Sequence, residues 1–166
     1  MIKLKLLLES MTEWFYHATT AKALPGIMER GLLPAEETNW GGDLGKWSEG
    51  KVFLTDRFKR AVFYGNAGIW QKEHINQFKP LLRIRLDKTE LEEDPQSNDD
   101  YYSEIPIRGN FEIFVPTEET ETPDERGNVL YAEFNSEWRP LTKDIADAIA
   151  TGEWDGETID DKENYD

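Results

Sequence analysis

The sequence predicts an α+β domain of two small packed β-sheets with flanking helices. Two strand-like segments are each followed by a helical pattern, and several more strand-like segments come later without helices between them. A doubly wound parallel sheet would need more strand–helix alternation, and the chain has no Gly-x-Gly-x-x-Gly fingerprint and no phosphate-loop lysine motif. A length of 166 residues, 38% of them hydrophobic, suits one domain with a real core.

The first predicted strand and helix lie within residues 14–31. Trp14-Phe-Tyr-His17 has the aromatic composition of a strand, and the small and hydroxyl residues after it suit the start of a helix. Apolar residues recur on one helical face from 23 to 30, and Gly31 is expected to end that helix in the left-handed conformation.

The second predicted strand and helix begin at residue 51. Lys51-Val-Phe-Leu-Thr55 is a compact strand, Asp56 can cap the helix that follows, and an apolar stripe runs from Phe58 through Ala61 and Val62. Residues 35–50 before this strand show no period and hold Trp40 and Trp47, which predicts a long loop of the kind that borders ligand sites.

The remaining elements are mostly strands. Alternation predicts strands over residues 80–86 and 111–115, and a third strand is expected over 129–134. Residues 118–127 are polar and predict a loop, and residues 141–150 predict a terminal helix with one apolar side.

Charge and composition exclude several classes of function. The chain has no cysteine and two histidines, so no transition-metal site is expected. A net charge of −15 repels phosphate backbones, which disfavours a nucleic-acid partner. No apolar run is long enough for a membrane span or a signal-peptide core, so we expect a cytoplasmic protein that does not act on a membrane.

Three segments together resemble the ADP-ribosyltransferase superfamily, in the branch with diphtheria toxin and the poly(ADP-ribose) polymerases. Phe15-Tyr-His-Ala-Thr19 resembles the opening His-Gly-Thr strand of that family, and a helix and Gly31-Leu32 follow it. Gly50-Lys-Val-Phe-Leu-Thr55 with Ala61 and Tyr64 is similar to the family's second strand and its Ala-x-x-Tyr helix turn. Asn110-Phe-Glu-Ile-Phe-Val115 resembles the strand that bears the catalytic glutamate. The resemblance covers roughly residues 14–116.

The resemblance implies that NAD is the substrate, that no metal takes part, and that His17, Tyr64 and Glu112 are the catalytic residues. His17 would donate a hydrogen bond to the ribose beside adenine, and Ala18 and Thr19 would help to hold the nicotinamide end. Tyr64 would stack on the nicotinamide ring, and Phe53 would form a wall of the cofactor site. Apart from the resemblance, Trp40 and Trp47 are candidate cofactor-binding residues: the pair either covers the cleft or only pins the long loop that carries it. Glu112 would bind the nicotinamide ribose and stabilise a cationic, oxocarbenium-like transition state.

Two departures from the family and several alternatives stay open. Phe53 stands where the family usually has tyrosine, and Ala18 where it has glycine. Glu104 and Glu118 lie near Glu112 in the sequence and are alternative catalytic carboxylates. Structural interpretations also remain: His17 as a strand-end histidine bonded to backbone, Tyr64 as a core residue, Glu112 as a solvent-facing strand residue, and the second histidine, His74, as an exposed one without a role.

The two ends of the chain are predicted to lie outside the domain. Residues 1–11 form an N-terminal appendage, either a short helix packed on the domain or a cleavable leader, because Leu7-Leu-Glu9 is similar to head-targeting peptides of internal proteins of tailed phages. Residues 12–151 form the ADP-ribosyltransferase-like domain. Residues 152–166 hold seven acidic residues and one lysine, which predicts an acidic tail.

Three functions follow from the sequence. The first is an NAD-dependent mono-ADP-ribosyltransferase that modifies a macromolecule, with a protein as the expected acceptor. The second keeps the fold without the chemistry, as a phage virion or host-interaction protein packaged in the phage head. The third is an RNA 2′-phosphotransferase or nucleic-acid ADP-ribosyltransferase, which requires that the scattered basic residues converge in space: Lys51, Arg57, Lys59, Arg60, Arg83, Arg85 and Arg108.

Overall fold

The structure is a computed structural model of the whole chain that describes most, not all, of its residues. The described ranges are 11–35, 49–67, 80–97, 99–115, 121–123, 129–131 and 137–153. Within them, only the backbone is described for 63–67, 115, 121–123 and 129–131. Both predicted appendages therefore lie almost wholly outside the described residues, and so do Trp40, Trp47, His74, Glu118 and the side chain of Tyr64.

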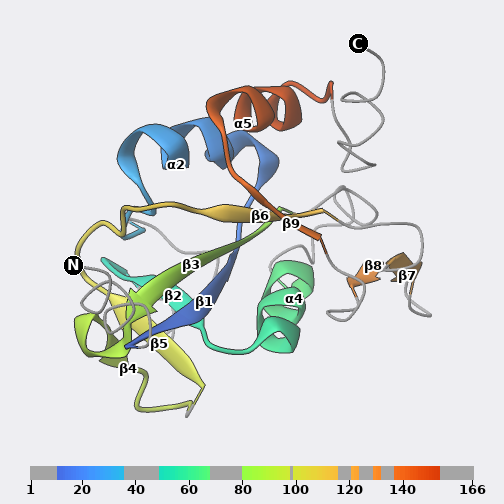
Figure 1. The fold of residues 1–166 in the computed structure, drawn as a ribbon. Coiled ribbons are helices and arrows are strands. Elements are labelled where there is room, and N and C mark those ends of the chain that lie inside the picture. The colour runs from blue at the N-terminus through green and yellow to red at the C-terminus, as the bar shows by residue number, and fades with distance from the viewer. Residues whose placement is uncertain are drawn as a thin grey trace.

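Helices and strands alternate only in the first part of the described chain (Figure 1). The helical elements are η1 (Ala21–Ala23), α2 (Leu24–Arg30), α4 (Phe58–Ala67), η3 (Lys88–Glu90) and α5 (Lys143–Ala150). The strands are β1 (Thr12–Ala18), β2 (Val52–Thr55), β3 (Leu81–Asp87), β4 (Glu92–Glu93), β5 (Asp100–Ser103), β6 (Glu112–Val115), β7 (Glu121–Pro123), β8 (Val129–Tyr131) and β9 (Glu137–Pro140).

The described strands form one seven-stranded antiparallel sheet and a separate two-stranded hairpin. The order in the large sheet is β4-β5-β2-β1-β3-β6-β9, and β7 pairs with β8. The prediction of a mixed domain in which strands and helices segregate is confirmed. The prediction of two small packed sheets is corrected, because β1 joins the strands on its two sides into one sheet.

In the middle of the large sheet, the backbone pairing between β1 and β2 is short. β1 pairs with β3 over its whole length, from Thr12 opposite Asp87 to Ala18 opposite Leu81. In contrast, β1 and β2 are in register at a single residue pair, Tyr16 opposite Thr55. The strands β4, β5 and β2 are thus connected to the rest of the sheet by a narrow junction, which we call the β1/β2 junction.

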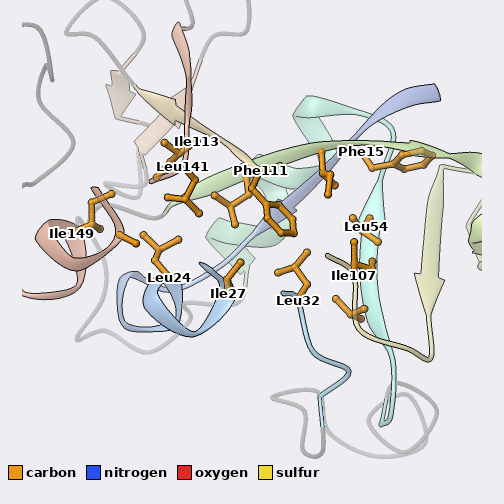
Figure 2. Close-up of a cluster of buried hydrophobic side chains, with 14 of the residues drawn as sticks. Phe15, Leu24, Ile27, Leu32, Leu54, Ile107, Phe111, Ile113, Leu141 and Ile149 are labelled. Carbon is orange, nitrogen blue, oxygen red and sulfur yellow. The ribbon is translucent and has the colours of Figure 1, made fainter. Parts of the chain in front are cut away.

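The larger hydrophobic core lies on the sheet face that α2 and α5 cover (Figure 2). Phe15, Leu82 and Ile113 come from three neighbouring strands and are fully buried there. Leu24 of α2 and Ile149 of α5 pack against them, so both helices bury their apolar sides on this face.

The other face is covered by α4, whose apolar stripe is confirmed. Phe58, Ala61 and Val62 are buried in a second cluster with Tyr16 and Phe114 of the sheet. The two clusters lie on opposite faces because successive residues of a strand point to opposite sides, as Phe15 and Tyr16 do.

A backbone bridge closes the first strand–helix unit. Gly31 ends α2 with φ +83° and ψ −175°, so the chain leaves the helix with a positive φ but in an extended conformation and not in the left-handed helical one. The next residue, Leu32, then forms a two-way backbone hydrogen bond with Ile107 (2.9 Å each way). A side-chain carbon at Gly31 would lie 2.4 Å from the Ile107 carbonyl oxygen, so this approach requires glycine.

Several local predictions need correction. The Oδ1 of Asp56 has no hydrogen-bond partner within the described residues, and the Thr55 hydroxyl accepts instead from the N–H of Arg57 (3.2 Å). Strand β7 lies inside the segment predicted as a polar loop, and β4, β5 and β9 were not expected from the sequence.

Candidate functional site

His17 lies at the β1/β2 junction, on the first strand and one residue beyond the only paired position. Its Nδ1 is 2.7 Å from the carbonyl oxygen of Phe53 on β2. A carbonyl oxygen can only accept, so Nδ1 carries the proton and donates this hydrogen bond. The imidazole therefore spans the two strands where their backbone pairing stops.

The surroundings keep the His17 ring neutral. Burial lowers its pKa from the ordinary value of 6.5, and the hydrogen bond to Phe53 only partly opposes this shift. In a neutral ring with the proton on Nδ1, Nε2 is a hydrogen-bond acceptor. The family resemblance implies that His17 donates to a ribose, whereas this tautomer would accept a hydrogen bond from a ribose hydroxyl.

The side chains of Ala18 and Phe53 project toward the face of the sheet that α4 covers, opposite to the face of the His17 ring. Ala18 packs against the cluster that includes Phe58 of α4, and Phe53 alternates with Leu54, which belongs to the opposite core. The N–H of Thr19 is already bonded to the Pro80 carbonyl (3.0 Å) and is not available to a ligand.

Glu112 lies two strands from β1, on the face of α4. It is opposite Arg83 on β3, which in turn is opposite Tyr16 on β1, so all three side chains project from the same face. His17 belongs to the alternate row with Leu82 and faces the other side of β1. Two strand spacings, or about 10 Å, separate β6 from β1. The structure therefore brings the His17 imidazole to the backbone of Phe53, whereas the side chains of Ala18, Phe53 and Glu112 project from the opposite face of the sheet.

Arg83 holds the carboxylate of Glu112 from one side. Its Nε donates to Oε1 at 2.7 Å, and its Nη2 lies 2.6 Å from the same oxygen. The guanidinium is stacked between the rings of Trp14 (3.9 Å) and Trp138 (4.3 Å), and 19% of the Arg83 side chain is exposed. Two aromatic faces and one carboxylate fix this cation in place.

Of the remaining predicted catalytic and cofactor-binding residues, the structure describes Glu104 and the backbone of Tyr64. Glu104 is exposed and directly follows β5. Tyr64 lies on α4, which faces the same side of the sheet as Ala18 and Phe53, although its side chain is outside the described residues. Trp40, Trp47 and Glu118 are outside them as well.

The described arginines are mostly matched by carboxylates. Arg57 contacts Asp99 (3.1 Å), and Arg60 donates two hydrogen bonds to the buried Asp100 (2.7 and 3.1 Å). With Arg83 bound to Glu112, three of the basic residues that a phosphate-rich substrate would need are already neutralised. These pairs join α4 to β5 and β3 to β6, which is a structural role.

The sequence did not indicate the partners of His17 and Glu112. The carbonyl of Phe53 and the guanidinium of Arg83 come from strands that are neighbours only in space. The alternation of arginines with apolar residues on β3 was the one available signal, because it puts Arg83 on the face opposite the buried Leu82 and Ile84.

Within the described residues, no three histidine, cysteine, aspartate or glutamate side chains gather as a metal site would require. None of the described helices is long and apolar enough to cross a membrane. Comparisons of the chain with protein-family models, with curated proteins and with solved structures give no match.

Proposed function

We propose that this protein is an NAD-dependent mono-ADP-ribosyltransferase with an ADP-ribosyltransferase-like fold. In the reaction, the bond between nicotinamide and ribose C1′ breaks, nicotinamide leaves, and C1′ forms a bond to an acceptor nucleophile that gives up its proton. We expect the acceptor to be a protein side chain.

The observation that carries the proposal is the state of His17. A half-buried imidazole with a lowered pKa and with Nδ1 bonded to the Phe53 carbonyl presents Nε2 as an acceptor of defined direction. Ribose hydroxyls are donors that such an acceptor can bind. The side chains of Ala18 and Phe53 project from the adjacent residues toward the opposite, α4 face, where the backbone of Tyr64 is also found.

Glu112 has a specific role in this proposal. Arg83 occupies Oε1, so Oε2 would accept a hydrogen bond from the nicotinamide ribose. Because Arg83 already compensates its charge, Glu112 would act mainly by orienting the ribose as positive charge develops at C1′.

One observation favours a second candidate, a catalytically inactive protein of the same fold that acts in a phage virion or on a host partner. The Arg83–Glu112 pair and its two tryptophans join β1, β3, β6 and β9, so the pair also serves sheet packing. The nucleic-acid alternative has no comparable support in the described part of the chain, since Arg57, Arg60 and Arg83 are paired.

The test uses NAD labelled in its ADP-ribose half, the full chain and an extract of candidate host cells. The expected results are nicotinamide release and transfer of label to protein. Glu112→Gln should lower both rates about 100-fold or more while NAD affinity changes little, since removal of one transition-state contact has effects of this size. Glu137→Gln is the matched control, because Glu137 lies on the adjacent strand β9 in a looser pair with Arg139 (3.6 Å).

The outcomes separate the candidates. Binding of NAD without nicotinamide release would favour the inactive protein, and absence of both would overturn the proposal. An active Glu112→Gln variant would move the catalytic role to Glu104 or Glu118.

A further inference from the structure

Trp138 on β9 contacts both the Arg83–Glu112 pair and helix α4. The Arg83 guanidinium lies over its ring, 4.3 Å from the ring centroid. The same ring makes an edge-to-face contact with Phe58, the first residue of α4, with 6.3 Å between the centroids and 81° between the planes. Trp138 therefore connects the helix to the ion pair.

Further ring contacts hold Trp138 itself in place. Its ring centroid lies 5.3 Å from that of Phe114 on β6 and 5.7 Å from that of Tyr16 on β1. Both of these rings are buried, as is Phe58, so the indole packs on the core that α4 covers. A side chain with three such neighbours has few alternative rotamers, and the guanidinium that lies over it is confined as well.

The second tryptophan at Arg83 has a different position. Trp14 on β1 has its ring centroid 3.9 Å from the guanidinium carbon of Arg83, and the Arg85 guanidinium also lies over it (4.7 Å). Among the described residues, the Trp14 ring makes no aromatic contact with α4. Trp14 thus adds a second flat surface for the cation, and Trp138 adds the link to the helix.

Arg83 transmits this constraint to Glu112. Its Nε and Nη2 both approach Oε1 of the carboxylate, at 2.7 and 2.6 Å, so a change in the position of the guanidinium moves the carboxylate with it. An arginine side chain without stacking partners can adopt many rotamers. The contacts from α4 through Trp138 to Arg83 therefore fix the carboxylate relative to the helix that carries Tyr64.

We propose that Trp138 is a positioning residue for Glu112. It holds Arg83 against the carboxylate and sets the position of the carboxylate relative to α4, so that the acid group and the helix keep one geometry during the reaction. The inference deepens the proposed function, on which it rests for the reaction that Glu112 serves. Nothing in the family resemblance assigns a role to Trp138.

A double-mutant cycle tests this chain of contacts without any ligand. Trp138→Leu and Glu112→Gln are made singly and together in the full chain, and urea unfolding measures the free energy of unfolding of each variant. The loss in the double variant should be smaller than the sum of the two single losses, because removal of the indole already loosens the ion pair. With Arg83→Met as the starting chain, the two losses should add, since the connecting cation is gone.

Glu137→Gln is the matched control in this cycle. Glu137 directly precedes Trp138 on β9, but it projects to the other face of the sheet and pairs with Arg139. Its combination with Trp138→Leu should show additive losses.

The kinetic test measures nicotinamide release from NAD by the folded variants. Trp138→Leu should lower kcat about tenfold or more and leave KM nearly unchanged, because the carboxylate is misplaced while the contacts to NAD remain. Trp138→Phe keeps a flat ring and should restore most of the rate. Arg83→Lys keeps the charge without the planar fork, and its kcat should fall as that of Trp138→Leu does. At a temperature where every variant is folded, a loss of stability alone would not lower kcat.

The two measurements separate the two proposals. An active wild type with additive losses in the cycle, or with an unchanged kcat in Trp138→Leu, would overturn the positioning role and leave the proposed function standing. Coupled losses that vanish in Arg83→Met, together with no nicotinamide release by wild type, would keep the link from Trp138 to Glu112 and overturn the NAD-dependent function. Additive losses without nicotinamide release would overturn both.

Discussion

The surroundings of His17 favour one protonation state and one tautomer, and both preferences have identifiable causes. Burial lowers the pKa of the ring, which favours its neutral form, and the Phe53 carbonyl selects the Nδ1–H form. The resulting Nε2 can accept a hydrogen bond from a ribose hydroxyl. The same contact agrees with the structural interpretation of a strand-end histidine bonded to backbone, so ligand binding is what distinguishes the two.

His17 should make stability depend on pH. Its pKa is lowered on folding, so between the ordinary value of 6.5 and the lowered folded value the unfolded chain binds a proton that the folded chain does not. The free energy of unfolding therefore falls as pH falls through this window and is recovered above it. Urea unfolding at pH 7.5 and 5.5 should show a smaller loss on acidification in His17→Gln than in wild type.

The ionisation of Asp56 changes the free energy of unfolding with pH in the opposite direction to that of His17. The contribution of His17 is therefore measured by comparing the variant with wild type. Burial and the nearby Asp99 raise its pKa from the ordinary 3.8, so its contribution is present at low pH and is lost as pH rises through the raised value. Both chains in the comparison contain Asp56, so its effect cancels. An equal loss in wild type and His17→Gln would contradict a neutral, buried His17.

At the residue scale, the sequence predicted positions better than partners. The junction of His17, Ala18 and Phe53 follows from two strands that the composition had indicated. The stack of Arg83 between Trp14 and Trp138 could not be predicted, because it joins three strands that are far apart in sequence.

At the scale of elements, the close approach of two backbones fixes the position of α2. Gly31 has φ +83°, and a side-chain carbon at this position would lie 2.4 Å from the Ile107 carbonyl oxygen. Any other residue here would therefore meet both backbone strain and a steric clash. Gly50 has a similar φ of +73° with no atom near its missing side chain. Comparison of Gly31 with Gly50 therefore separates the cost of a positive φ from the cost of a steric clash.

Alanine substitutions at these two glycines should therefore differ. Gly50→Ala is expected to lower the free energy of unfolding by about 1 kcal/mol, from the positive φ alone. Gly31→Ala should lower it by about 3 kcal/mol or more, because the chain must also shift away from the Ile107 carbonyl. Urea unfolding measures both, and equal losses would show that the approach to Ile107 is unimportant.

The elements with strong apolar periodicity were predicted well, and the short ones were not. β1, α2, β2, β3 and β6 match their predicted positions within two residues at each end. β5 contains the buried Asp100, whose charge is compensated by Arg60, so it lacks the apolar alternation of a recognisable strand. β9 has four residues, among them a proline and a charged pair, and gives no period either.

At the scale of the whole molecule, the β1/β2 junction is the feature that organises the candidate site. One residue pair joins two parts of the sheet, and the hydrogen bond from His17 to the Phe53 carbonyl lies beside it. The sequence predicted two small sheets although it indicated the connecting strand β1, because a local pattern does not show which strands pair. The connection depends on long-range pairing of β1 with strands on both sides, which local patterns do not encode.

If Nε2 of His17 accepts a hydrogen bond from NAD, nitrogen-15 NMR of the histidine rings should detect it. Without ligand at pH 7.5, we expect a neutral ring for His17 with the proton on Nδ1. Addition of NAD should change the Nε2 resonance of His17 and leave the tautomer unchanged, and His17→Gln identifies the signal. A His17 ring with the proton on Nε2, or an Nε2 resonance that does not respond to saturating NAD, would show that His17 does not bind NAD in this way.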